Sequence, residues 1–270
     1  MIPGFIDAET NLLTRPGESH ITAALEFAGR MLARGTTAIG LSVGGSADPK
    51  AEAVMLAAAG SLGARAPSTV AITWRAATSD VARLVGPAAA RVAGFAGITC
   101  PGEERAGAIA KDLAPLKTRL RTCDHPACRC WHGFEPVTAG GRKMLGSPAI
   151  PLLRPAGADR FASDIVSRIE SEGRAVALAS DSSIDSVRIE GMPFMVDAAV
   201  DCAGMPFELA LWAATRGGAL AIGDSERGRL RLGSHADVLV LEGSEPSAIL
   251  ERPDGDPAAA IVLGGTIVPR

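Results

Sequence analysis

Two polar side chains directly follow a short apolar strand near the start of the chain, in positions suited to chemistry. The stretch "PGFIDAETNLL" covers residues 3–13, and its apolar first half predicts a strand that delivers Glu9 and Asn11 at its C-terminal end. A carboxylate can bind a cation, whereas an amide is a weak, neutral ligand that suits harder ions than zinc. The alternative is structural, with Glu9 capping the end of the strand layer and Asn11 bonding a loop backbone.

A third candidate, Asp181, closes the clearest apolar strand of the sequence, "RAVALASD" (174–181). Beside a metal ion, such a carboxylate can accept a proton from the metal-bound water. Without the ion, water has a pKa of about 15.7 and is too weak an acid for an ordinary aspartate to activate. Because Ser182 and Ser183 follow, Asp181 has the alternative role of hydrogen-bonding the next turn.

A cluster of cysteine and histidine lies in "CDHPACRCWH" (123–132), which holds three of the five cysteines and two of the four histidines. Thiolates and imidazoles are the ligands that zinc selects. The spacing matches no standard finger pattern and lacks a second, distant ligand pair. A structural zinc site is therefore one hypothesis, and cysteines that pack as small apolar residues are the other. The candidate ligands are Cys123, His125, Cys128, Cys130 and His132.

Short apolar strands alternate with alanine-rich helical patterns along most of the chain. Strands are expected at residues 2–7, 36–42, 69–74, 91–98, 119–123, 149–153 and 174–181. Helices are expected at residues 20–34, 49–62, 103–114, 159–172 and 206–216. This alternation favours right-handed βαβ units and a parallel sheet, which carries its chemistry at the C-terminal ends of its strands. Glu9, Asn11 and Asp181 fall at such ends, so we expect them to lie together.

The last two apolar runs, "ADVLVLEG" and "AAIVLGGTIV", follow each other too closely for a βαβ unit. Their alternating character predicts strands of a separate small sheet.

The composition excludes several classes of partner and favours a cytoplasmic protein. A net charge of −3 gives no reason to expect nucleic acid or an anionic membrane. No uncharged apolar run reaches the roughly 18 residues of a membrane span, and the first residues do not resemble a signal peptide. An odd number of cysteines without such a signal indicates reduced thiols or ligands.

Four stretches of the sequence resemble the amidohydrolase superfamily. "PGFIDAETNLLTRPGE" is similar to the opening of dihydroorotases, and "ARGTTAIGLS" to the strand that follows in them. "SPAIPLLRPAGADRFASDIVSRIESEGRAVALASDSS" resembles their late barrel strand and the loop and helix before it. "ELALWAATRGGALAIGDSERGRLRLGSHADVLVLEG" resembles the C-terminal signature of the superfamily. Dihydroorotases are the first choice, and imidazolonepropionases, which share the two ends, are the second.

The resemblance implies a shortened TIM-like (β/α) barrel with a C-terminal β-sandwich remnant. The resemblance divides the chain into a barrel over residues 1–225 and small sandwich strands over residues 226–270. Members hydrolyse or close a cyclic amide with one or two zinc ions at the barrel mouth.

This chain departs from the family where the chemistry takes place. The two metal-binding histidines of the family correspond to Glu9 and Asn11, and a substrate-binding arginine corresponds to Leu13. Arg15 could replace that arginine if the loop is shifted, and Asp181 is the candidate for a vestigial catalytic base. We therefore expect no metal at the mouth.

The leading hypothesis is a noncatalytic dihydroorotase-like chain that serves as an assembly partner, for example of aspartate transcarbamoylase in pyrimidine biosynthesis. The alternative is an active hydrolase of a cyclic amide, of dihydroorotase or hydantoinase type, with a zinc site rearranged around Asp181, His125 and the cysteines. A third hypothesis is a protein that binds a small molecule in the old pocket without chemistry. Since a shortened barrel leaves a strand edge that needs covering, we also expect a homo-oligomer or a partner chain.

Overall fold

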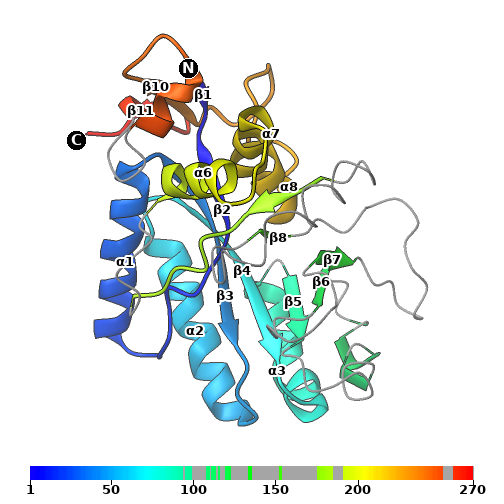
Figure 1. Cartoon of the computed structure of the whole chain (residues 1–270). Coiled ribbons are helices and arrows are strands. Elements are labelled where there is room, and N and C mark those ends of the chain that lie inside the picture. The colour runs from blue at the N-terminus through cyan, green and yellow to red at the C-terminus, as the bar shows by residue number, and fades with distance from the viewer. Residues whose placement is uncertain are drawn as a thin grey trace.

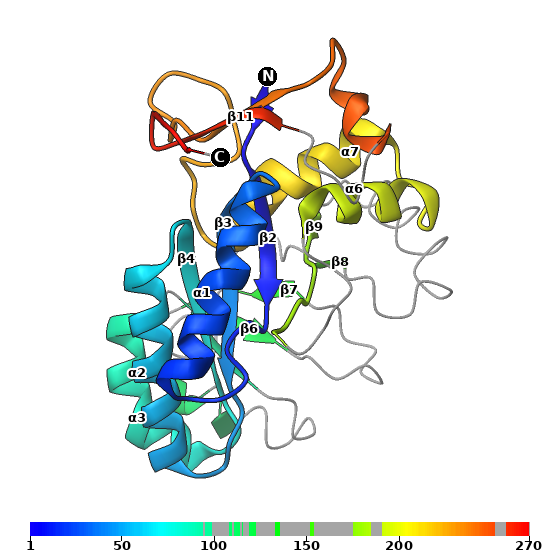
Figure 2. The same cartoon turned by 90° about the vertical axis from the view of Figure 1, so that its left-hand side faces the viewer.

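A central layer of strands, with helices packed on one face and a small sheet at one end, forms the frame of the molecule (Figures 1 and 2). The computed structural model describes residues 1–93, 95–98, 108–109, 111–113, 115, 119–122, 133–135, 152–153, 175–184, 191–251 and 258–269. The structural statements below concern these residues. No helix among them is long and apolar enough to cross a membrane.

The larger sheet has six strands in the order β2-β3-β4-β5-β6-β7. Strands β2 to β6 are parallel to their neighbours, and β7 is antiparallel to β6. Their bounds are Phe5–Thr10 (β2), Thr36–Gly44 (β3), Thr69–Ala76 (β4), Phe95–Ile98 (β5), Arg119–Thr122 (β6) and Gly133–Glu135 (β7). The parallel sheet that the strand–helix alternation predicts is confirmed.

A second parallel pair, β8 (Leu152–Leu153) and β9 (Ala177–Leu178), extends this layer on the side of β2. Beyond β9 the chain runs parallel to the end of β2. The amide of Asp181 donates to the carbonyl of Glu9 over 3.0 Å, and the amide of Asn11 donates to the carbonyl of Ser182 over 2.7 Å. The parallel order is therefore β8, β9, β2 and onward to β6. Within the described ranges no ladder joins β7 to β8, so closure of the barrel is not seen.

Three long helices cover one face of β2, β3 and β4 (Figure 2). Their bounds are Glu18–Ala33 (α1), Pro49–Arg65 (α2) and Ser79–Val92 (α3). Side-chain oxygens start two of them: Asp48 accepts from the amide of Lys50 over 3.0 Å, and Thr78 accepts from the amide of Val81 over 3.2 Å. Gly35, with φ 92°, follows the end of α1, a position where glycine commonly ends a helix.

The main core lies between these helices and the strands. Ile39 and Leu41 of β3 and Trp74 of β4 are fully buried against apolar residues of the helices, such as Met31 and Leu62. Because side chains alternate along a strand, the neighbours of these residues point to the opposite face, away from the helices.

The later helices and the small sheet form a second apolar cluster at the other end of β2 (Figure 1). The helices are α6 (Met192–Asp201), α7 (Phe207–Trp212), the π-helix η2 (Ala213–Gly217), α8 (Gly218–Ala221) and the 3-10 helix η3 (Pro246–Glu251). The small sheet is antiparallel, with the order β1 (Ile2–Pro3), β10 (Val238–Leu241), β11 (Ala258–Leu263) and β12 (Thr266–Ile267). The separate C-terminal sheet is thus confirmed, and the first residues of the chain pair with it.

Several element predictions need correction. The strand expected at 91–98 begins only at Phe95, because a helix capped by Thr78 continues through an alanine run to Val92. The helices α3 and α6 were not predicted. Of the strand expected at 174–181, only residues 177–178 are described as a strand, β9, and Asp181 leaves the extended conformation with φ 54°. The helix expected at 159–172 lies outside the described residues, as do parts of the one expected at 103–114.

Candidate functional site

The C-terminal end of β2 brings three predicted residues together: Glu9, Asn11 and Asp181. Asn11 donates a hydrogen bond from its Nδ2 to Oδ1 of Asp181, and backbone hydrogen bonds join the segments that carry them. Asp181 is half-buried and is the only described non-glycine residue with positive φ. Aspartate tolerates this left-handed conformation better than most residues. The local strain and the bond from Asn11 fix the position of the Asp181 carboxylate.

Glu9 is held by a partner that the sequence did not suggest, Arg75 at the end of β4. The Arg75 Nη2 forms an ion pair with the Glu9 Oε1, and the side chain of Glu9 is only 1% exposed. A buried carboxylate stays charged only when it is paired, because burial removes the hydration of the charge. Since Trp74 points into the helix-covered core, its neighbour Arg75 lies on the opposite face, where it meets Glu9 across β3. We call Glu9, Asn11, Arg75 and Asp181 the strand-end site.

A further carboxylate, Asp7, lies fully buried in β2 beneath this site. It accepts hydrogen bonds from the Ser180 backbone amide over 2.9 Å and from the Ser180 hydroxyl. Burial raises the pKa of Asp7 to about 7, and the negative charge of Asp181 adds to the increase, while the hydrogen bonds from Ser180 and Glu9 oppose it. Asp7 therefore anchors the segment after β9 to β2 and titrates near neutral pH.

The loop that follows β3 is shaped by Glu52 of α2. This buried carboxylate accepts from the Trp74 Nε1 over 2.8 Å and from the Ser46 amide over 2.5 Å, and burial raises its pKa. A side chain at Gly44, which has φ 100°, would place its Cβ 2.7 Å from the Glu52 Oε2. The close approach of carboxylate and backbone therefore requires glycine at position 44.

The donors of the strand-end site fit a zinc ion poorly. A cation bound to Glu9 would lie beside the positive guanidinium of Arg75, and Asp181 already accepts a hydrogen bond from Asn11. Neutral amides are also weak ligands for zinc. Across the described ranges, no three side chains of His, Cys, Asp or Glu are grouped so that they could hold a metal ion.

The other predicted site residues do not join this group. Arg15 is exposed on the loop after β2, and no described hydrogen bond or ion pair links it to Glu9, Asn11 or Asp181. Leu13 is buried in the main core. The five candidate ligands at 123–132 lie outside the described residues, so the hypothesis of a structural zinc remains a prediction.

Sequence reasoning missed Asp7, Arg75 and Ser180. A usable signal existed for two of them. Asp7 is a lone charge inside the apolar run "GFIDA", and Arg75 follows the apolar strand "VAITW" just as Glu9 follows its own strand. The rule that polar residues at strand ends meet would have included Arg75 if the strand had been continued by one residue.

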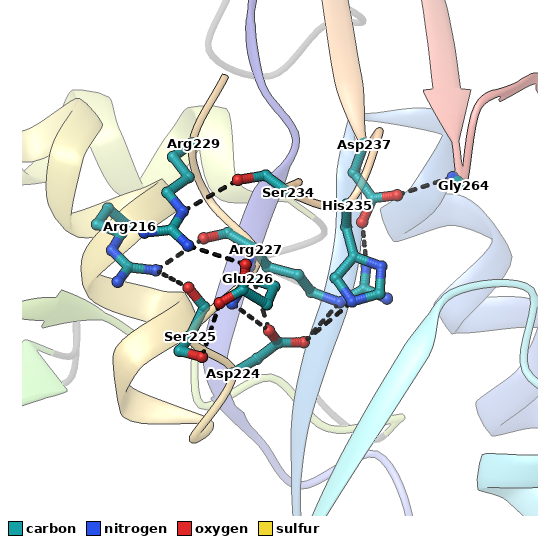
Figure 3. Close-up of polar contacts among 10 residues, drawn as sticks. All are labelled: Arg216, Asp224, Ser225, Glu226, Arg227, Arg229, Ser234, His235, Asp237 and Gly264. Atoms are coloured by element: carbon teal, nitrogen blue, oxygen red, sulfur yellow. Dashed lines mark hydrogen bonds and ion pairs between the residues drawn. The ribbon is translucent and has the colours of Figure 1, made fainter. Parts of the chain in front are cut away.

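A second polar cluster lies at the opposite end of the sheet and joins the loop after α8 to the small sheet (Figure 3). Arg227 is nearly buried and forms ion pairs with Asp224, over 2.9 Å, and with Asp237. Asp237 in turn accepts from the amide of Gly264 over 2.8 Å. Because the carboxylates engage Arg227 from both sides, this cluster serves as a structural tie.

Comparisons with known proteins cover the chain unevenly. No protein-family model matches it. An imidazolonepropionase from Mycolicibacterium smegmatis is 32% identical over 127 residues, which are 46% of this chain and 32% of that enzyme. An imidazolonepropionase from Syntrophobacter fumaroxidans is 36% identical over 113 residues, or 40% of this chain and 26% of that enzyme. The chain therefore matches only about a quarter to a third of the length of these relatives.

Solved structures match over the whole chain at low sequence identity. The 5-methylcytosine deaminase from Klebsiella pneumoniae superposes with a TM-score of 0.74 at 14% identity, covering 100% of this chain and 86% of that one. The N-acetylglucosamine-6-phosphate deacetylase from Pasteurella multocida gives a TM-score of 0.64 at 13% identity, with the same coverage. The preference for dihydroorotases over imidazolonepropionases is not supported by these relatives. The chain therefore shares the fold of these deaminase and deacetylase structures, and part of its sequence is similar to imidazolonepropionases.

Proposed function

We propose that this chain is a noncatalytic protein of the amidohydrolase fold, whose strand-end site is closed by internal polar pairs. The observation that supports this best is the ion pair between Glu9 and Arg75, at a position where the family's catalytic members carry a metal-binding histidine. Asn11 and Asp181 form the second pair. Within each pair, the two side chains bond each other. None of the four groups supplies the nitrogen ligands that a hydrolytic zinc requires.

The loss of a metal does not remove the fold, because the core depends on apolar packing between β3, β4 and the helices. Such a chain can retain surfaces for other proteins. As an assembly partner we propose a second copy of the chain or a transcarbamoylase of the aspartate type. Size-exclusion chromatography of the full chain at micromolar concentration, with and without that enzyme, tests this. A new peak of larger mass is expected, and independent elution of two monomeric species contradicts it.

The noncatalytic proposal is tested by zinc content and hydrolysis measured together. We expect the purified full chain to leave dihydroorotate, hydantoin and imidazolone propionate unchanged over hours in the presence of zinc. Zinc bound to residues 123–132 would be lost in the double variant Cys128→Ser and Cys130→Ser, and would persist in Glu9→Gln. Turnover that Glu9→Gln or Asp181→Asn abolishes would refute the proposal.

The second candidate is an active cyclic-amide hydrolase, and the partial homology to imidazolonepropionases favours it. In this case Asp181 would act as the base, and a metal would have to displace Arg75 from Glu9. Steady, zinc-dependent opening of the imidazolone ring by the wild-type chain, lost in Asp181→Asn, would support this function. The structure-based expectation is that no such activity occurs.

A further inference from the structure

A pocket of about 580 Å³ lies between α7, η2, η3 and β1. Pro3, which precedes β2, is part of its lining, so the pocket opens at the N-terminal ends of the strands. The strand-end site lies at the other end of β2. Figure 1 shows this separation, with α7 beside β1 and the tips of β3 and β4 far from them. The pocket is therefore distinct from the strand-end site.

One wall of the pocket is an apolar face of the helix. Phe207, Leu211 and Trp212 line it at helical spacing, and Pro246 and Leu250 face them from η3. Two aromatic rings and two aliphatic side chains offer a surface suited to a flat apolar group.

The polar group of the pocket is Arg216. Its Nη1 donates to the backbone carbonyls of Ser225 over 2.9 Å and of Arg227 over 3.0 Å (Figure 3). Unlike Arg227 and Arg229, Arg216 forms no direct ion pair within the described part of the chain, although the carboxylates of Glu226 and Asp224 are close enough to act on its charge. Its Nε and Nη2 have no hydrogen-bond partner there either. Partial burial lowers the pKa of Arg216, and the positive charge of Arg229 adds to the decrease, while Glu226 and Asp224 oppose it.

The backbone around Arg216 is also unusual. Thr215 and Arg216 belong to the π-helix η2, a rare turn that occurs often at functional sites. The turn is held in place by Gly217 and Gly218, where a Cβ would collide with the carbonyl oxygens of Val176 and Ile6. The position of Arg216 at the pocket is thus fixed by backbone packing against β9 and β2.

We propose that this pocket binds a small carboxylate with a flat apolar body, whose anionic group pairs with Arg216. A guanidinium with donors to spare forms strong charge-assisted hydrogen bonds with a carboxylate, and the rings of Phe207 and Trp212 accommodate the apolar part. Glu208 and Glu245 also line the pocket, but both are exposed, so water screens their charge.

Calorimetry and ligand-observed NMR with 3-phenylpropionate test the proposal on the full chain. We expect millimolar or tighter binding, and at least about tenfold weaker binding of the neutral 3-phenylpropionamide. Arg216→Gln should abolish binding, and Arg216→Lys should retain part of it. Ser247→Trp, at the exposed rim, should block the pocket while leaving Arg216 in place. The matched control is Arg231→Gln, an exposed arginine of the same loop that does not line the pocket.

Thermal melting of each variant checks that it is folded. If Arg216→Gln is unfolded, Ser247→Trp still tests whether the ligand binds in this pocket. The expected dissociation constant is about 1 mM or lower, so the proposal is overturned if no binding of 3-phenylpropionate is seen at about 10 mM. Equal binding of the acid, the amide and 3-phenylpropylamine would also overturn it, because the pocket would then select only for apolar surface. Stronger binding of the amine would assign the selectivity to Glu208 and Glu245 instead.

Discussion

Glu9 and Arg75 form a buried ion pair at the C-terminal end of the large sheet. The carboxylate is almost completely buried, while the guanidinium is 16% exposed toward solvent. Burying either charge without the other would be unfavourable, because the free-energy cost of removing its hydration is larger than the free energy gained from packing. The pair therefore makes each residue dependent on the other.

Replacement of Arg75 by alanine tests this dependence. The free energy of unfolding should fall by about 3–5 kcal/mol, because the buried carboxylate of Glu9 loses the guanidinium that faces it. The double variant Glu9→Gln and Arg75→Gln should recover part of the loss. Urea denaturation measures both, and the control is Arg65→Ala. Arg65 pairs with Glu18 over 2.7 Å at the surface, with side chains 42% and 70% exposed, so its loss should cost less than about 1 kcal/mol. Equal effects at Arg75 and Arg65 would contradict the argument.

Asp7 predicts a pH dependence of stability. Burial raises its pKa in the folded chain from 3.8 to about 7, so the folded state binds a proton that the unfolded state releases. The contribution of Asp7 to the free energy of unfolding is therefore greatest below pH 4. It declines by on the order of a few kcal/mol as the pH rises toward 7. Asp7→Asn should remove most of this decline in denaturation curves recorded between pH 4 and pH 8. An unchanged slope in the variant would show that other groups cause it.

At the level of elements, the η2 turn packs closely against the backbone next to β9. A Cβ at Gly217 would overlap the carbonyl oxygen of Val176, a backbone atom that cannot move without disturbing β9. The π-turn thus depends on glycine for space, with φ −59° close to an ordinary helical value.

Gly217→Ala should therefore destabilise the fold by at least about 2 kcal/mol, through overpacking. The control is Gly29→Ala within α1, where a Cβ meets nothing within 4 Å. That change should stabilise the chain by roughly 0.5–1 kcal/mol, since alanine favours helix. Thermal unfolding of the two variants distinguishes them, and a neutral Gly217→Ala would mean that the strand relaxes.

Prediction from sequence succeeded where one periodicity dominated. The apolar runs at 36–42 and 69–74 became β3 and β4, and the helix ended by Gly35 became α1. It failed where weak patterns compete: α3 carries Pro87 inside the helix, which reads as a break, yet the helix runs on to Val92. The sequence predicted only part of the strand-end site. Strand ends located Glu9, Asn11 and Asp181, but only the packing of β2 against β3 and β4 places Arg75 within reach of Glu9.

At the scale of the whole molecule, the strand-end site and the Arg216 pocket occupy opposite ends of one sheet. The small sheet receives β1 from the start of the chain and β10 to β12 from its end, so both termini meet there (Figure 1). Arg227 ties this sheet to the loop after α8. Polar pairs thus link separate segments of the chain at both ends of the large sheet.

Anomalous diffraction at the zinc absorption edge, from crystals of the full chain soaked in zinc, tests the central claim most directly. The account predicts no anomalous peak within bonding distance of Glu9, Asn11 or Asp181, and an intact contact between Glu9 and Arg75. A peak at 123–132 would leave this claim standing. A zinc ion coordinated by Glu9 and Asp181, with Arg75 turned away, would contradict it.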